Sequence, residues 1–360
     1  MREGELIILL GAGTSVEAGI PHSKEMVEKV EGLLLHDDAW TQYLGLYNFI
    51  KASLMGAELM KGRPAVAPDI ERIVNTLSEL EKNTDCTLYP FISGWHQRFC
   101  DLAGRNFDCI RSFRQLIVRR LRDWIAINSY AKSSYYDGLY RLRDELKFAL
   151  RIFSLNYDLC VEHNANDRAL EMGFDGDTER WDFRRFEARD EVPTHIYLYK
   201  LHGSITWYRD RQEGNILKLS ATPHAEPDLI FGTDYKMQYI DPYLFYAYEL
   251  RRYSLEAKII LAIGYSFRDE HINGIITQAL RNDSSRVLLA VSPNASKAIR
   301  ELSPDGSTQC KAYDVPAAQF LREVTIAQLE KLAGIQREET PLSEPAQELV
   351  QDPPQDAQAV

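Results

Sequence analysis

The sequence predicts an α/β fold: a Rossmann-like, doubly wound parallel sheet with a large helical insertion. Largely apolar runs at 6–10, 149–155, 195–201, 257–263 and 287–291 are typical of parallel strands that are covered on both faces. Helical segments separate several of these runs, as in a sheet wound from both sides. Glycine-rich or polar loops follow the runs directly, where doubly wound folds bind their ligands.

The bulk composition indicates a folded protein. Of the 360 residues, 45% are hydrophobic and 11% are aromatic, which excludes wholesale disorder. The net charge of -11 argues against direct binding of nucleic acid. We find no signal peptide and no segment as long as a membrane span, so we expect a cytoplasmic protein. The five cysteines form no Cys-x-x-Cys pair, so we expect neither a bound metal nor a disulfide framework.

The first strand leads straight into a glycine turn. The run 6–10 is followed by Gly11 and Gly13 and then by the hydroxyls of Thr14 and Ser15. Because Gly11 and Gly13 lack a Cβ, this turn can let a pyrophosphate approach closely. A helix that starts here would direct its free N–H groups at the anion. The turn therefore predicts a nucleotide site, although a purely structural turn has the same pattern.

The next hundred residues are predicted to be a helical insertion at about 36–146. Helical periodicity marks three segments in and before it, 24–35, 69–80 and 113–127. Near the end of the chain, prolines and acidic residues accumulate over 336–360, which predicts a disordered acidic tail. We therefore expect one catalytic domain over 1–335, interrupted by the insertion.

Three further loops carry polar side chains at the ends of predicted strands. Asn156 and Asp158 can bind ribose hydroxyls or position a water, although both residue types also favour turns. His202 can act as a base near neutral pH, and Gly203 beside it can let the backbone approach a ligand. Taken alone, His202 fits a structural role. The last loop repeats the combination of a glycine and a hydroxyl, in Gly264 and Ser266.

Taken together, these motifs resemble the sirtuin family. They are Gly-Ala-Gly-Thr-Ser-x-x-x-Gly-Ile-Pro at 11–21, Asn-Tyr-Asp at 156–158, Lys-Leu-His-Gly-Ser at 200–204 and Gly-Tyr-Ser-Phe at 264–267. The resemblance covers about residues 6–320. It is closest to the bacterial sirtuin-like branch that is associated with phage defence.

The resemblance implies that NAD is the substrate and that matching residues bind it. By this resemblance Asn156 and His202 are catalytic, and Asp158 and Asn156 would hold the nicotinamide ribose and the attacking water. The residues around the pyrophosphate would be Ala12, Gly13, Thr14 and Ser15. The adenosine side would meet Gly264 and Ser266, with Ser292 and Asn294 near the adenine ribose. The rest of the implied binding set is Gly11, Gly19, Ile20 and Gly203.

The chain departs from the deacetylase sirtuins at two places. Those enzymes have Asp-Phe-Arg after Gly-Ile-Pro, where this chain has His22, Ser23 and Lys24, and they carry four zinc cysteines that this chain lacks. Since the zinc module supports the acyl-lysine cleft, its loss puts protein deacetylation in doubt and leaves the NAD chemistry untouched. We expect an NAD+ glycohydrolase. The alternatives are an NAD-dependent deacylase or ADP-ribosyltransferase, and a nucleotide-binding scaffold without catalysis.

The resemblance also implies partners. Stand-alone members of this size can form large homo-oligomers and work with a separately encoded HerA-type ATPase. A defence NADase must stay silent until infection, because NAD depletion kills the cell. The helical insertion is a candidate interface for such control, and internal packing explains its amphipathic faces equally well.

Overall fold

A seven-stranded parallel sheet forms the centre of the protein. The computed structural model describes residues 1–81, 97–104, 107–166, 169–187, 195–231, 240–303 and 306–334. The strand order is β3-β4-β2-β1-β7-β8-β9, and every neighbouring pair is parallel. The strands are β1 (Leu6–Leu10), β2 (Leu150–Ser154), β3 (Leu170–Glu171), β4 (Ile196–Lys200), β7 (Ile259–Ile263), β8 (Val287–Val291) and β9 (Cys310–Tyr313). The predicted acidic tail at 336–360 lies outside the described residues.

The sequence predicted five of these strands and missed the short ones. The predicted runs correspond to β1, β2, β4, β7 and β8, and β1, β7 and β8 are buried along their whole length. The two edge strands, β3 and β9, were missed because they are short and only partly buried, so they lack an apolar run. A separate antiparallel hairpin of β5 (Trp207–Asp210) and β6 (Ile216–Leu219) was also missed.

The two faces of the sheet bury two separate cores. Alternate side chains of a strand point to opposite faces, so Ile8 of β1 enters one core and Ile7 enters the other. The helices α7 (Asp137–Leu146), α8 (Cys160–His163), α12 (Ala317–Glu323) and α13 (Ile326–Ala333) cover the Ile8 face. The helices α9 (Tyr243–Glu256), α10 (Glu270–Asn282) and α11 (Ala295–Leu302) cover the Ile7 face. The sheet is therefore wound on both faces, as predicted.

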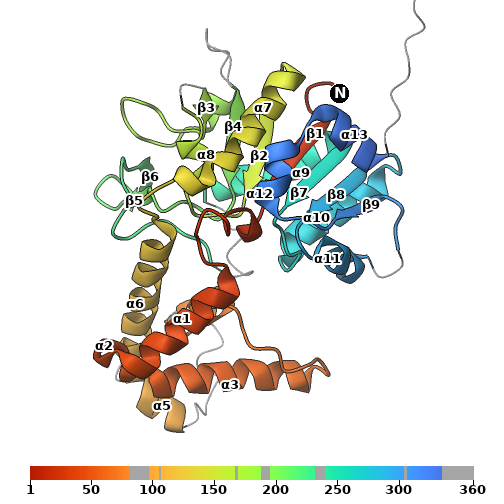
Figure 1. Ribbon diagram of the computed structural model, residues 1–360. Helices are drawn as coiled ribbons and strands as arrows, with labels where there is room; N and C mark the ends of the chain where they lie inside the picture. Colours follow the sequence, from red (N-terminus) through yellow and green to blue (C-terminus); the bar gives the residue numbers. More distant parts are fainter. Residues whose placement is uncertain are drawn as a thin grey trace, which may run out of the picture.

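A large helical insertion separates β1 from β2. Its helices are α1 (Ser23–His36), α2 (Asp38–Thr41), α3 (Leu44–Met60), α4 (Ile70–Glu81), α5 (Gln97–Ala103) and α6 (Asp108–Ile125), followed by α7. Figure 1 shows α1, α3, α5 and α6 gathered in a lobe beside the sheet. Their buried faces join the same core as the Ile8 face of the sheet, so lobe and sheet share one hydrophobic interior. Part of the segment, 82–96 and 105–106, lies outside the described residues.

The helix bounds agree with the predicted periodicity except at α6. The segments 24–35 and 69–80 correspond to α1 and α4, shifted by one residue at most at each end. Helix α6 begins at Asp108, five residues before the predicted start at 113. Its buried side chains, Ile110, Phe113, Ile117, Leu121 and Ile125, follow helical spacing. Across the described residues, no helix is both long enough and apolar enough to cross a membrane.

Candidate functional site at the carboxyl edge of the sheet

The carboxyl ends of the parallel strands bring the predicted motifs to one edge of the sheet. The turn after β1 packs directly on the loop after β7. The Gly11 amide donates to Ile263 O at 2.9 Å, and the Gly13 amide donates to Gly264 O at 2.9 Å. The Thr14 hydroxyl also donates to Ile263 O, at 2.7 Å. The two loops are thus joined by hydrogen bonds.

The glycines in this turn are required by the protein's own packing. A Cβ on Gly11 would lie 2.6 Å from Gly264 O, and a Cβ on Gly264 would lie 2.1 Å from Thr14 N. Gly264 also has a φ of +63°, which L side chains rarely adopt. The close approach that these glycines allow is therefore between two loops of the chain. Contact between Gly11 or Gly13 and a ligand stays a prediction.

The predicted helix start at this turn is wrong. Only a single 3-10 turn, η1 (Ala12–Thr14), follows β1, and no side chain caps it. The first long helix, α1, begins at Ser23, where His22 and Glu25 cap it reciprocally: the Glu25 amide donates to His22 Nδ1, and the His22 amide donates to Glu25 Oε2. The Thr14 hydroxyl donates to Ile263 O and caps no helix here.

Ser15 connects the turn to the loop after β2 through a buried polar network. Its hydroxyl donates to Asp158 Oδ2 at 2.6 Å and accepts from Asn156 Nδ2 at 3.1 Å. A hydroxyl has one proton, so the Tyr136 hydroxyl, 2.8 Å away, must donate to Ser15. Burial, followed by the Asp158 charge, raises the pKa of Tyr136 and keeps that donor protonated. The structure therefore joins the predicted residues Ser15, Asn156 and Asp158.

One atom of this network lacks a partner. Asn156 is 6% exposed, and its Oδ1 is buried with no hydrogen bond within the described residues. A buried carbonyl oxygen without a donor is costly, typically by about 1–3 kcal/mol. Such an atom is suited to accept a hydrogen bond from a ligand hydroxyl or a water. The structure thus gives Asn156 the free acceptor that a substrate-binding role requires.

The Asn156–Asp158 loop is held in place by Lys200, a residue that was not among the predicted site residues. Lys200 ends β4 and is 1% exposed. Its ammonium donates to Asp158 O and to Glu162 Oε1, the latter at 2.7 Å. The Asp158 carboxylate is further fixed by the Cys160 amide, which donates to Oδ1 at 2.9 Å. The sequence indicated this role only through the position of Lys200, a single lysine at the end of a largely apolar strand.

His202 meets an acidic partner from the opposite side of β1. His202 follows β4 and Asp269 follows β7, and two strands lie between them in the sheet, a span of about 14 Å. Even so, His202 Nε2 lies 3.4 Å from Asp269 Oδ2, with both side chains buried. The loops after β4 and β7 therefore cross the carboxyl ends of β2 and β1 and meet above them. His202 was predicted from its place after an apolar run, whereas Asp269 was not predicted.

The backbone around His202 is also held by contacts with residues 228–230 of the same chain. Gly203 has a φ of +87°, and a Cβ there would lie 2.1 Å from Asp228 O. The Ile230 amide donates to His202 O at 2.9 Å, which anchors the loop to the segment before residue 231. Gly203 is thus explained by contact with Asp228, and its contact with a ligand stays a prediction.

The insertion contributes the remaining wall of this edge. Tyr157 and Tyr265 lie next to the start of α4, and burial raises the pKa of both hydroxyls. The charges of Glu71 and Asp269 add to that effect at both tyrosines, with Asp269 the larger of the two at Tyr265. The Tyr157 ring is 6.2 Å from the His202 ring, centroid to centroid. Negative charge from the insertion therefore faces the two aromatic side chains that border the site.

Other predicted binding residues lie at the periphery. The side chains of Ala12, Ser266 and Asn294 are exposed, as is Gly19, whereas Ile20 is buried. Asn294 immediately precedes α11 and makes no side-chain cap there. None of the five makes a side-chain hydrogen bond to the Ser15 network within the described residues. They stay predictions for the part of a ligand that extends away from the centre.

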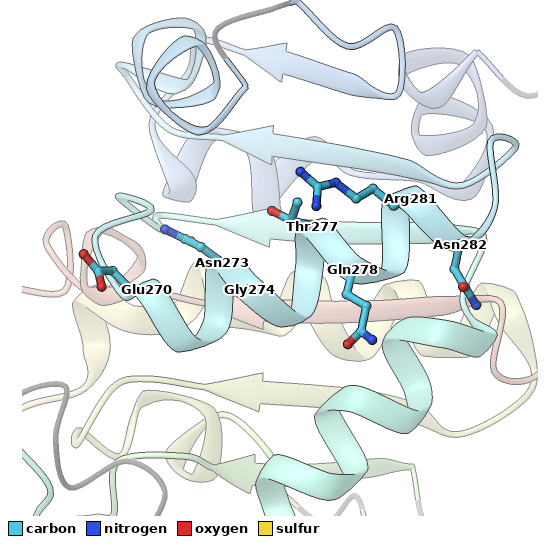
Figure 2. Close-up of a pocket in the computed structure, with 7 residues that line it drawn as sticks. All are labelled: Glu270, Asn273, Gly274, Thr277, Gln278, Arg281 and Asn282. Carbon is cyan, nitrogen blue, oxygen red and sulfur yellow. The ribbon is translucent and has the colours of Figure 1, made fainter.

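A surface groove is present elsewhere, along the outer face of α10. It has a volume of about 460 Å³. Its lining, shown in Figure 2, comes from one helix face: Glu270, Asn273, Gly274, Thr277, Gln278, Arg281 and Asn282. None of the predicted site residues lines it. The sheet edge is the stronger candidate, because the Ser15 network and the His202–Asp269 pair bring residues there from the ends of four different strands.

No metal site competes with this interpretation among the described residues. Nowhere in them do three His, Cys, Asp or Glu side chains gather in an arrangement that could hold an ion. Cys160, which lies beside Asp158, is not a reactive thiol, since burial and the Asp158 charge raise its pKa.

Part of the chain is similar to a known protein family. A family model described as a SIR2-like domain matches residues 150–314. Solved structures similar to the chain include a mutant Sir2 homologue with 2′-O-acetyl-ADP-ribose, at 13% identity and a TM-score of 0.43, covering 92% of this chain and 94% of that chain. A Sir2 homologue–NAD complex is similar at 13% identity and a TM-score of 0.42, covering 88% and 86%. No curated protein matches the chain.

Proposed function

Taking the chain as a sirtuin-like protein, from the SIR2-like match over residues 150–314, we propose that it is an NAD+ glycohydrolase. It would cleave NAD+ to nicotinamide and ADP-ribose. The observation that carries the proposal is the buried Ser15–Asn156–Asp158 network with His202 near the same edge. At this edge, Asn156 Oδ1 and both ring nitrogens of His202 are buried without a hydrogen bond in the described residues.

The reaction needs few groups because nicotinamide is already a cationic leaving group. The C1′–N bond breaks with both electrons going to nicotinamide, which leaves an oxocarbenium-like ribose. Water then adds to C1′ and gives up one proton. Asn156 Oδ1 would accept a hydrogen bond from that water or from a ribose hydroxyl, which orients it. His202 would take the proton as general base.

Ser15 and Asp158 have a supporting role in this proposal. Both oxygens of the Asp158 carboxylate are occupied, one by Ser15 and one by the Cys160 amide. Each oxygen keeps a second lone pair, so the carboxylate can also accept a ribose hydroxyl without losing either bond. Preorganised polar groups of this kind cost no reorganisation at the moment of reaction.

The test is to incubate the full chain with NAD+ and measure nicotinamide release. We expect Asn156→Ala to lower turnover roughly 100-fold or more and His202→Ala by about 10²–10⁴-fold. The matched controls are Asn282→Ala and His36→Ala, two exposed residues of the same types on α10 and α1. Normal turnover in both Asn156→Ala and His202→Ala would contradict the catalytic roles proposed for these two residues.

The same assay separates the alternatives. Nicotinamide release that requires an acylated peptide would indicate a deacylase, and release that requires an acceptor protein would indicate an ADP-ribosyltransferase. Binding of NAD+ without any product after long incubation would indicate a scaffold. Each of these results contradicts the glycohydrolase.

We further propose that the protein is a cytoplasmic antiphage effector whose catalytic domain spans 1–335. Burial of Ser15 and His202 supports a requirement for activation, since NAD+ must reach side chains that are 1% and 3% exposed. Homo-oligomerisation and a separately encoded HerA-type ATPase are the proposed means of control. Native mass measurement and co-purification test both, and a monomer that binds no ATPase contradicts them.

A further inference from the structure

The start of α10 orients the Asp269 carboxylate toward His202. Asp269 immediately precedes α10, and its Oδ1 accepts the amides of His271 at 3.1 Å and Ile272 at 3.4 Å. This leaves Oδ2 facing His202 Nε2 at 3.4 Å. The helix start therefore fixes one carboxylate oxygen, and that fixes the direction of the other.

A carboxylate in this position determines which imidazole nitrogen carries the proton. An ionised carboxylate accepts hydrogen bonds and donates none, so the N–H tautomer that faces it is favoured. Here that nitrogen is Nε2, which lies within ion-pair distance of Asp269 Oδ2 without meeting hydrogen-bond geometry. The neutral ring then has a bare Nδ1, which is buried and has no hydrogen-bond partner within the described residues. Nδ1 is thereby the basic atom.

We propose that Asp269 is a positioning residue that holds His202 in the Nε2–H tautomer, so that Nδ1 is the proton acceptor. The inference rests on the proposed function, in which His202 is the base. In the reaction Nδ1 takes the proton of the water that adds to C1′. The resulting imidazolium keeps its Nε2–H on the side of Asp269, whose charge stabilises it. Asp269 itself touches neither substrate nor the reacting water.

The decisive variant is Asp269→Asn, with Glu270→Gln as its matched control. Asparagine also caps helices well, so α10 keeps its start, while the amide can offer an N–H to Nε2 and favour the opposite tautomer. Glu270 is the neighbouring exposed carboxylate in the first turn of α10. We expect Asp269→Asn to lower kcat roughly 10- to 100-fold with little change in KM for NAD+, and Glu270→Gln to lower neither.

Two readouts besides the rate separate orientation from folding. Long-range ¹H–¹⁵N spectra of the full chain labelled in its eight histidines report the tautomer of His202, identified by the signal that His202→Ala removes. At a pH where the ring is neutral, we expect Nε2–H in the wild type and Nδ1–H in Asp269→Asn. In the His202→Ala background, Asp269→Asn should cost no further activity, because the two residues act as one unit.

The outcomes distinguish this inference from the proposed function. An unchanged tautomer in Asp269→Asn overturns the inference whatever the activity. A changed tautomer with an unchanged kcat overturns the positioning role. A changed tautomer in a protein whose wild type releases no nicotinamide supports the orientation and overturns the proposed function alone.

Discussion

At the scale of single residues, Ser15 is the side chain on which the candidate site most depends. Its one hydroxyl proton goes to Asp158, while its lone pairs take the Asn156 amide and the Tyr136 hydroxyl. The hydrogen bonds therefore all point toward Asp158: Asn156 and Tyr136 donate to Ser15, and Ser15 donates to Asp158. This arrangement holds Asn156 in one orientation and leaves its Oδ1 for a ligand.

The first prediction concerns that hydroxyl. Ser15→Ala removes the acceptor of Asn156 Nδ2 and of the Tyr136 hydroxyl and the donor to Asp158 Oδ2, so three buried polar groups lose a partner. We expect a loss of about 1–3 kcal/mol in the free energy of unfolding, measured by urea denaturation. Turnover of NAD+ should fall roughly 10-fold or more because Asn156 is no longer held.

The matched control is Ser254→Ala. Ser254 is also fully buried, but its hydroxyl has no hydrogen-bond partner among the described residues. Removing that hydroxyl should leave stability unchanged or slightly raised. Equal losses in the two serine variants would contradict the importance of the network.

At the scale of secondary-structure elements, the insertion is joined to the sheet domain through close helix contacts. Helix α7, which ends the insertion, packs against α12 near the end of the described chain. Gly138 lies in α7, and a Cβ there would lie 1.9 Å from Leu321 O of α12. The contact is backbone to backbone, so no side-chain rotation can relieve it.

The second prediction follows from this contact. Gly138→Ala should destabilise the protein by about 1–3 kcal/mol, since α7 and α12 must move apart. Gly32→Ala in α1 is the control: nothing lies within 4 Å of a Cβ there. That substitution should stabilise by roughly 0.5–1 kcal/mol, as expected for alanine within a helix. Thermal or urea unfolding of both variants checks the opposite signs.

Charge also joins elements of the lobe. Glu81 at the end of α4 accepts from Arg111 Nε at 2.9 Å and from Arg114 Nε at 2.6 Å, both on α6. Partial burial alone would raise the pKa of this carboxyl, but the Arg114 and Arg111 contacts outweigh it and lower the pKa below its ordinary value of 4.5. The ionised carboxylate therefore favours the folded state.

The third prediction is the pH dependence of this contact. A folded-state pKa that is lowered gives stability that is present above the unfolded pKa and is lost as the pH falls through the folded pKa. Glu81→Gln should therefore be less stable than the wild type at pH 7, and the difference should shrink below about pH 4.5. Glu28→Gln, at an exposed carboxylate 3.9 Å from Lys24, should show little difference at either pH. If the stability difference between the wild type and Glu81→Gln grew on acidification, the lowered pKa of Glu81 would be contradicted.

At the scale of the whole molecule, the central strands could be predicted from the sequence and the contacts between their loops could not. Strands β1, β7 and β8 are wholly apolar because both of their faces are buried, and that pattern is visible in the chain. Strands β3 and β9 lie at the edges, are short, and carry no such pattern. The apolar pattern of a sequence reflects burial, so partly buried edge strands cannot be predicted from it.

The candidate site shows the same division. Asn156, Asp158 and His202 stood out because polar residues directly follow apolar runs. Asp269 and Tyr136 did not, because their roles depend on strand order and on how the insertion folds back. Nothing local indicates that the loops after β4 and β7 cross two intervening strands to meet. The pairing of His202 with Asp269 is a property of the assembled sheet.

The most direct test of the central claim is product analysis of the full chain with NAD+ in oxygen-18 water. Hydrolysis at this edge predicts equal amounts of nicotinamide and ADP-ribose, with one heavy oxygen at C1′ of the ADP-ribose. Asn156→Ala should produce neither at the wild-type rate, whereas Asn282→Ala should match the wild type. Intact NAD+, a cyclic product without the heavy oxygen, or full activity in Asn156→Ala would contradict the account.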